Sequence, residues 1–147
     1  MKKIKIGLLP LYLELYDRIS TPDKRKPLEA FYAAVARDFR RRGLEVVEAQ
    51  ICRLKKEFAA AIRKFETAGA DAIVTLHLAY SPSLESSEAL ARTDLPVIIL
   101  DTTPDYEFGP DQSPAKIMFN HGIHGVQDMC NLLIRNNKPF EIEAGHW

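Results

Sequence analysis

The densest group of chemically capable side chains in this sequence is the run 120–125, Asn-His-Gly-Ile-His-Gly. In a helix, His121 and His124 would lie on one side, and Asp128 one turn further along could join them as a third metal ligand. The two glycines also allow a tight turn whose backbone N–H groups face an oxygen-rich ligand. A third interpretation is structural, with one histidine capping a helix or packing against the preceding loop. We favour ligand contact, and the spacing alone leaves the other two open.

Other polar residues interrupt or follow apolar segments. His77 stands at the end of an apolar run, where a histidine is more often a hydrogen-bonded core residue than a ligand. Tyr80 precedes Ser81-Pro82 and offers an aromatic ring with a hydroxyl, which suits either a sugar or ordinary packing. The carboxylates Asp17 and Asp101 have simple interpretations as a solvated group and a partner for loop N–H groups.

Alternating apolar and helical segments must position these residues. Apolar runs typical of strands buried on both faces alternate with amphipathic helical spacing. The expected strands are 4–11, 44–50, 71–78, 96–100 and 140–144. The expected helices are 27–42, which Gly43 stops, 54–69, 83–92, and a last one that begins at 126 and stops at about 136–139. We therefore predict one α/β domain over 1–147, doubly wound and flavodoxin-like (Rossmann-like), with a parallel five-stranded sheet in the order 2-1-3-4-5.

In an open α/β sheet, ligands bind outside the carboxyl ends of the strands, near the point where the strand order reverses. The segments after the first, third and fourth strands, and the run before the last helix, should therefore converge on one rim. The chain contains neither a G-x-G-x-x-G nor a Walker A motif, so nucleotide and FMN binding are disfavoured. The third strand ends at His77 instead of a carboxylate cluster, which argues against a receiver domain. The proline-rich segment 102–114 is long for a simple connection, as functional loops often are.

Composition excludes several classes of protein. The 147 residues carry 20 basic and 20 acidic side chains, so we expect neither nucleic acid nor an anionic membrane as a partner. The first apolar segment contains Lys5, Pro10 and Glu14, so it is neither a signal peptide nor a membrane span. Two distant cysteines form no disulfide framework, which favours the cytoplasm. No helix follows the last expected strand, so another subunit, or a later part of a longer protein, should cover that edge.

Three segments carry a resemblance to a known family. Residues 75–83 (Thr-Leu-His-Leu-Ala-Tyr-Ser-Pro-Ser), 95–103 (Leu-Pro-Val-Ile-Ile-Leu-Asp-Thr-Thr) and the run 120–125 resemble the N-terminal part of the L-arabinose/L-fucose isomerase family. The resemblance implies carbohydrate metabolism, with aldose–ketose isomerisation through an enediol in an oligomer. It also implies a divalent metal, commonly Mn²⁺, held by Glu and His residues of later domains. On this view residues 1–147 are the N-terminal domain of a longer protein.

The resemblance also implies which residues contact the sugar substrate. Tyr80 corresponds to a substrate-facing aromatic residue, and His124 to a histidine that reaches the sugar in a neighbouring subunit. His121 stands where the family has Gln, and Leu13, with Glu14 beside it, stands near another family Gln. These departures leave the sugar unassigned.

Isomerisation needs a base, an acid and a cation that polarises the carbonyl. The sequence places none of these around one carbon, so we expect this chain to contribute a substrate wall and a subunit interface, to bind no metal itself and to be inactive alone. The alternative is a stand-alone sugar-binding or sensor domain that uses the same rim without turnover. A third possibility is a structural domain whose bare last strand pairs with another chain.

Overall fold

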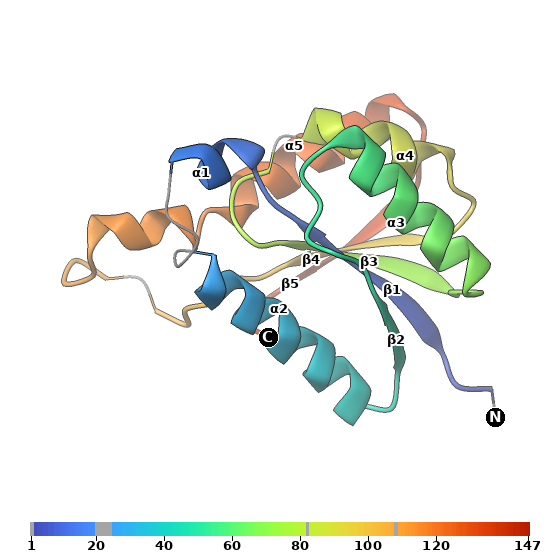
Figure 1. Cartoon of the computed structure of the whole chain (residues 1–147), viewed down its shortest axis with the longest axis horizontal. Coiled ribbons are helices and arrows are strands. Elements are labelled where there is room, and N and C mark those ends of the chain that lie inside the picture. Colours follow the sequence, from blue (N-terminus) through green and yellow to red (C-terminus); the bar gives the residue numbers. More distant parts are fainter. Residues whose placement is uncertain (1, 20–24, 82, 108) are drawn as a thin grey trace.

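The computed structural model describes residues 2–19, 25–81, 83–107 and 109–147. Its strands form one parallel sheet in the order β2-β1-β3-β4-β5, as the sequence predicts (Figure 1). The strands are β1 (Lys5–Leu11), β2 (Glu45–Glu48), β3 (Ala72–His77), β4 (Val97–Asp101) and β5 (Phe140–Ala144). The α-helices are α1 (Glu14–Ile19), α2 (Lys26–Arg41), α3 (Lys55–Thr67), α4 (Ser87–Arg92) and α5 (Gly122–Arg135), and two short 3₁₀ helices are η2 (Ser83–Glu85) and η3 (Pro114–Met118).

The helices cover the sheet unequally. The step from β1 to β2 runs opposite to the later steps, so right-handed crossovers put α2 on one face and α3, α4 and α5 on the other. Figure 1 shows this division. Apolar side chains of β1 and β3 alternate between the two cores: Leu8 and Leu76 pack on the α2 side, whereas Leu9 and Ile73 pack on the other. Burial on both faces explains why these central strands are nearly continuous apolar runs.

Three α-helical segments differ from the expected ones. The helix α1 was not expected, because its six residues include none that is buried and so give no amphipathic pattern. The expected helix 83–92 is divided into η2 and α4. Helix α5 begins at Gly122, which places His124 inside it and His121 at its N-cap. Pro82 of the resemblance motif lies outside the described residues.

Among the described helices, none has the length and apolar character needed to cross a membrane.

Candidate functional site

Three aromatic side chains and one carboxylate meet where β3 ends and α5 begins. The ring centroids of Tyr80 and His121 are 5.9 Å apart, and those of His121 and His124 are 4.4 Å apart in an edge-to-face arrangement. The Tyr80 hydroxyl donates a hydrogen bond of 3.0 Å to Oδ2 of Asp128. We call these four residues the aromatic rim. The structure thus brings together three of the five residues expected to contact substrate, and it adds Asp128 as their partner.

Helical spacing explains why the rim forms on one side of α5. His124 and Asp128 are four residues apart and therefore project from the same side. Gly122 and Gly125 lie at positions that face β3. A Cβ at Gly122 would stand 3.0 Å from the carbonyl oxygen of His77, and one at Gly125 would stand 2.6 Å from Cδ2 of its ring. The glycines therefore allow α5 to approach β3 closely, and they belong to the first turns of this helix and not to the separate tight turn that the sequence suggested.

His77 is the buried support beneath this helix. Its side chain is 2% exposed, and within the described part of the chain neither ring nitrogen makes a hydrogen bond of good geometry. Burial lowers the pKa of His77 to about 4, and the nearby Gly125 backbone opposes this shift to a smaller extent. The residue is therefore a neutral core histidine at neutral pH. The expected core position is correct, but the expected hydrogen bonding is not found.

Two buried serines hold the segment that carries Tyr80. The Ser81 hydroxyl donates to the carbonyl oxygen of Tyr12 at 3.3 Å, and the Ser83 hydroxyl donates to that of Gly125 at 3.1 Å. These bonds connect the end of β3 to the end of β1 and to α5. The Tyr80 ring is consequently placed by a fixed backbone, which favours a preformed binding surface.

The end of β1 carries its own polar cluster. The Asp17 carboxylate accepts hydrogen bonds from Arg25 at 3.1 Å and from Arg53 at 2.5 Å. The Arg25 guanidinium also lies 5.8 Å from the centroid of the Tyr12 ring, within the range of a cation–π contact. Arg53 is not among the residues expected from the sequence, although it follows Cys52, which bridges to Leu11 at the carboxyl end of the sheet. The rule that ligands bind beyond the carboxyl ends of the strands also selects Arg53 when it is applied to the second strand.

Leu13 and Glu14 are not joined to the aromatic rim. Glu14 pairs with Arg18 at 2.9 Å within α1, and Leu13 is half-buried. No hydrogen bond or ion pair of the described residues links either side chain to Tyr80, His121 or His124. They border the carboxyl edge of the sheet without belonging to the ring cluster.

Among the described residues of the segment after β4, Asp105 is linked to Asn120, the residue before the rim histidine His121. The side-chain amide of Asn120 donates to Asp105 at 2.9 Å, and its carbonyl oxygen accepts from the Asp105 N–H at 3.2 Å. Thr102 instead accepts from the backbone N–H of Trp147 at 3.2 Å. Asp101 is half-buried, and burial raises its pKa. The expected convergence therefore holds for Asn120, whereas Asp101 and Thr102 make their contacts elsewhere.

The rim offers hydrogen-bonding groups but no cluster of metal ligands. In the described ranges, no group of three or more His, Cys, Asp or Glu side chains is arranged to hold a metal ion. The imidazoles of His121 and His124 and the Asp128 carboxylate can instead donate to and accept from hydroxyl groups. The Tyr80 ring adds an apolar surface.

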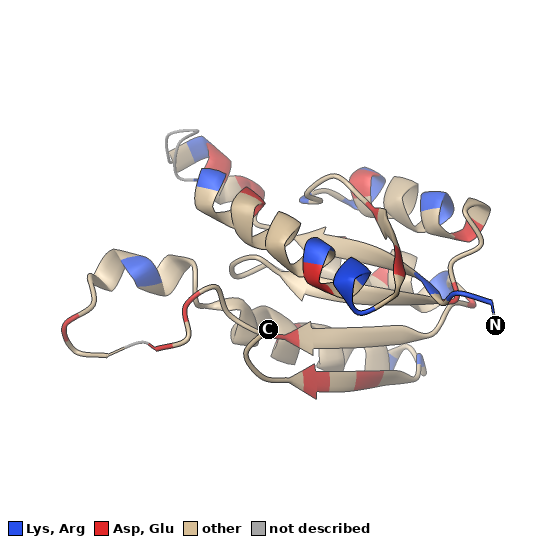
Figure 2. Cartoon of the chain, turned by 90° about the horizontal axis from the view of Figure 1, so that it is seen from below, with Lys and Arg blue, Asp and Glu red and all other residues tan. Residues whose placement is uncertain are grey.

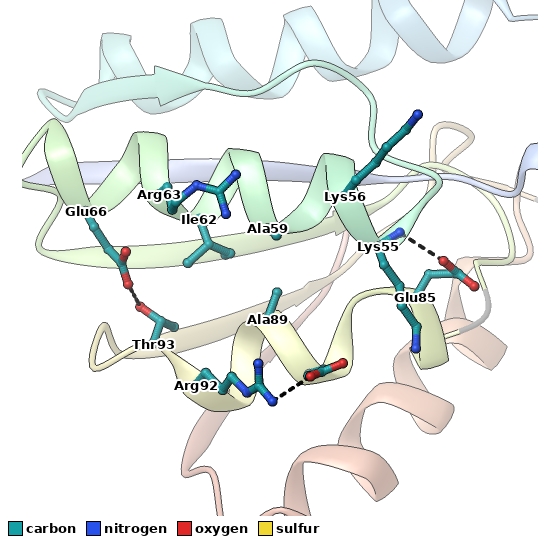
Figure 3. A pocket seen from close by; sticks show the side chains of 11 residues that line it. Lys55, Lys56, Ala59, Ile62, Arg63, Glu66, Glu85, Ala89, Arg92 and Thr93 are labelled. Carbon is teal, nitrogen blue, oxygen red and sulfur yellow. Dashed lines mark hydrogen bonds and ion pairs between the residues drawn. The ribbon is translucent and has the colours of Figure 1, made fainter.

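A separate hollow lies between α3 and α4. Figure 3 shows this groove of about 490 Å³, with Ile62 and Ala89 at its base and charged side chains of both signs around it. The Glu66 carboxylate accepts a hydrogen bond of 2.6 Å from Thr93 across the groove. None of its lining residues belongs to the aromatic rim, which is open on the surface of this chain.

Comparisons with known proteins give no family and no curated relative. No family model matches the chain, and no curated protein matches it. Among solved structures, it is similar to the Escherichia coli transcriptional repressor AscG, with 15% identity and a TM-score of 0.43 over 99% of this chain and 60% of that one. It is also similar to the Lac repressor bound to ONPG in the repressed state, with 14% identity and a TM-score of 0.45 over 100% of this chain and 49% of that one. The chain thus spans about half to three-fifths of the length of these structures, and a likeness at this level carries no argument about ligand or partner.

These findings correct the expected assignment to the L-arabinose/L-fucose isomerase family. The two solved structures named above are repressors and not sugar isomerases, and no family model and no curated protein matches the chain. The expectation of an isomerase N-terminal domain, with its aldose–ketose chemistry and its implied Mn²⁺, is withdrawn with it.

Proposed function

We propose that this chain is a binding or sensor domain that holds a small polyhydroxylated ligand, a sugar, at the aromatic rim without converting it. The observation that carries the proposal is the hydrogen bond from Tyr80 to Asp128 beside the rings of His121 and His124. It lies at the carboxyl edge of the sheet, which is the usual ligand position in this architecture.

The chemistry of the rim suits a sugar. A pyranose or furanose ring has apolar C–H faces that pack on an aromatic side chain, and hydroxyl groups that need both donors and acceptors. Tyr80 supplies the ring face, Asp128 accepts hydrogen bonds, and the imidazoles of His121 and His124 offer their ring nitrogens to hydroxyl groups. Tyr80, His121 and His124 are the proposed contacts, with Leu13 and Glu14 bordering the ligand from the end of β1.

The same groups are suited to binding a sugar and not to converting it. The Asp128 carboxylate is engaged by the Tyr80 hydroxyl, and His77 lies buried behind Gly125. A reaction at carbon needs an acid and a base on either side of the reacting atoms. The groups of the aromatic rim lie together on one side of α5, so they can grip one face of a ligand. We propose that the whole 1–147 domain acts in the cytoplasm, where its two free cysteines would stay reduced.

A titration with sugars tests the proposal. The purified chain is titrated with individual aldopentoses and aldohexoses while heteronuclear NMR shifts are followed and the recovered sugar is analysed. We expect saturable shifts centred on α5, with the sugar returned unchanged. Tyr80→Phe and His124→Ala should each weaken binding about tenfold, as expected for loss of a hydrogen bond to a ligand.

Two matched variants control for general effects. Tyr106→Phe and His146→Ala change the same residue types in a different ring pair, whose centroids are 5.0 Å apart. Both should bind as the unmodified chain does. Equal loss in rim and control variants, absence of saturable binding across the panel, or conversion of the sugar would each reject the proposal.

A further inference from the structure

Among the described helices, none covers the β4–β5 half of the sheet face on which α2 packs (Figure 2). Trp147 reaches the α2 side of this half, where it packs on Phe31 beside Leu100. The β4–β5 register places Ile98 opposite Glu141 and Leu100 opposite Glu143, so these four side chains share one face. Ile98 and Leu100 pack against the α2-side core but stay partly exposed, and both glutamates are exposed. Figure 2 shows α2 crossing one half of the sheet, while β4 and the acidic β5 lie beside it. We call this surface the open half-face.

The outer side of α2 is complementary to the open half-face. Ala30, Ala33 and Arg37 are exposed and lie at helical spacing directly opposite the buried side of α2, which carries Leu28 and Val35. Two alanines on a helix surface allow another apolar surface to approach closely, and an arginine follows one turn later. A helix of 16 residues is about 24 Å long, so α2 can cross the full length of five-residue strands of about 17 Å.

The outer side of α2 and the open half-face carry charges of opposite sign. Within the described ranges, neither Arg37 nor Glu141 nor Glu143 takes part in an ion pair, whereas the neighbouring Arg40 and Arg41 are paired with Glu48 and Asp38. Arg37 lies on the side of α2 opposite the one that packs on the sheet, so within one copy it faces away from the sheet that carries the two glutamates.

We propose that a second copy of this chain covers the open half-face, with α2 of each copy packed on β4 and β5 of the other. In this dimer the two-fold axis runs parallel to the strands, midway between the two sheets. Rotation about it places the half of one sheet that α2 covers opposite the open half-face of the other copy. Ala30 and Ala33 then pack on the partner's apolar pair, and Arg37 faces its two glutamates. This inference is independent of the sugar proposal.

Edge-to-edge pairing of two β5 strands is the competing arrangement. It would extend the sheet but would bring Glu141 and Glu143 of both copies together, and like charges on neighbouring strands are destabilising. Pairing through α2 instead neutralises them. The charge pattern therefore favours the face over the edge.

The test is the mass in solution and its response to charge reversal. Light scattering after size exclusion should give twice the chain mass of 16.6 kDa for the unmodified protein. Arg37→Glu should weaken the dimer about tenfold or more, because it sets three anions against one another. Glu143→Arg should weaken it similarly, and the double variant Arg37→Glu/Glu143→Arg should restore it. Arg63→Glu, an exposed arginine on α3 at the opposite face, is the matched control and should remain dimeric.

Circular dichroism establishes that each variant is folded. If Arg37→Glu does not fold, Glu141→Arg and Glu143→Arg carry the test, and each should weaken the dimer. A monomer at all concentrations, a dimer that Arg37→Glu leaves intact, or a double variant that stays monomeric would each overturn the proposal.

Discussion

The imidazole of His77 lies so close to Gly125 that a Cβ at that glycine would stand 2.6 Å from ring atom Cδ2. We therefore predict that Gly125→Ala forces α5 away from β3 and lowers the free energy of unfolding by about 1–3 kcal/mol, the usual range for overpacking. The midpoint and slope of urea unfolding measure this loss. Gly145→Ala is the control, because no atom lies within 4 Å of a Cβ there. A Gly125→Ala protein as stable as the control would show that the helix is not held against His77.

Lowering the pH should reduce the free energy of unfolding through the titration of His77. Burial lowers the pKa of His77 to about 4, below the ordinary value of 6.5 that it regains on unfolding. As the pH falls, the unfolded chain binds the proton on His77 before the folded chain does. The free energy of unfolding is therefore unaffected by His77 above pH 6.5 and falls progressively between pH 6.5 and about pH 4. The full difference amounts to about 3 kcal/mol. Urea unfolding from pH 7 to pH 4 measures the slope.

A His77→Leu variant isolates this contribution from the carboxylates that also titrate in acid. It removes two ring nitrogens that find no hydrogen-bond partner of good geometry among the described residues, so it should fold. Its stability should fall less steeply between pH 6.5 and pH 4 than that of the unmodified chain. Parallel curves for the two proteins would mean that the pKa of His77 is the same in the folded and unfolded states.

The sheet could be predicted from the sequence because its strands are buried on both faces and separated by clear helical spacing. The order β2-β1-β3-β4-β5 follows from right-handed crossovers between such elements. Helix α1 could not be predicted in this way: Leu15 and Ile19, which would have marked an apolar side, are 52% and 62% exposed. Helix α5 was expected four residues too late because Gly122 and Gly125 indicate a turn when read locally. Their small size serves a close contact with His77, which only the tertiary structure shows.

The site was predictable in outline and not in its pairings. The carboxyl-edge rule correctly selected Tyr80 and His121 as neighbours, although 41 positions separate them in the sequence. Asp128 was considered only as a metal ligand, and it proved to be the acceptor for the Tyr80 hydroxyl. Side-chain pairs of this kind depend on how far α5 slides along β3, and no sequence pattern specifies that distance.

The Tyr80 hydroxyl should titrate abnormally because of this acceptor. The hydrogen bond to Asp128 is the main cause that raises the pKa of Tyr80, with burial and the negative charge of Asp128 adding to it. We expect Asp128→Asn to lower that pKa toward 10, since it removes the charge that disfavours tyrosinate. The ultraviolet difference titration between the unmodified chain and Tyr80→Phe isolates this one tyrosine among five. Because Asp128 is exposed, stability should change by no more than about 0.5 kcal/mol. An unchanged midpoint would indicate that the bond is absent in solution.

Packing in the core on the α3 side can be tested at Gly7. A Cβ at this position of β1 would come within 2.4 Å of the ring of Phe65, a fully buried residue of α3. Gly7→Ala should therefore destabilise the protein by about 1–3 kcal/mol. Phe65→Leu alone should also be destabilising, because it leaves a cavity beside β1.

The double variant should be more stable than the sum of the two losses predicts, since the smaller side chain makes room for the new methyl group. Urea unfolding of all four proteins gives the coupling. Strictly additive losses would contradict this prediction, because they would mean that the contact with Phe65 is not the source of the cost of Gly7→Ala. The strand backbone offers no other source, since alanine is more favourable than glycine in a strand.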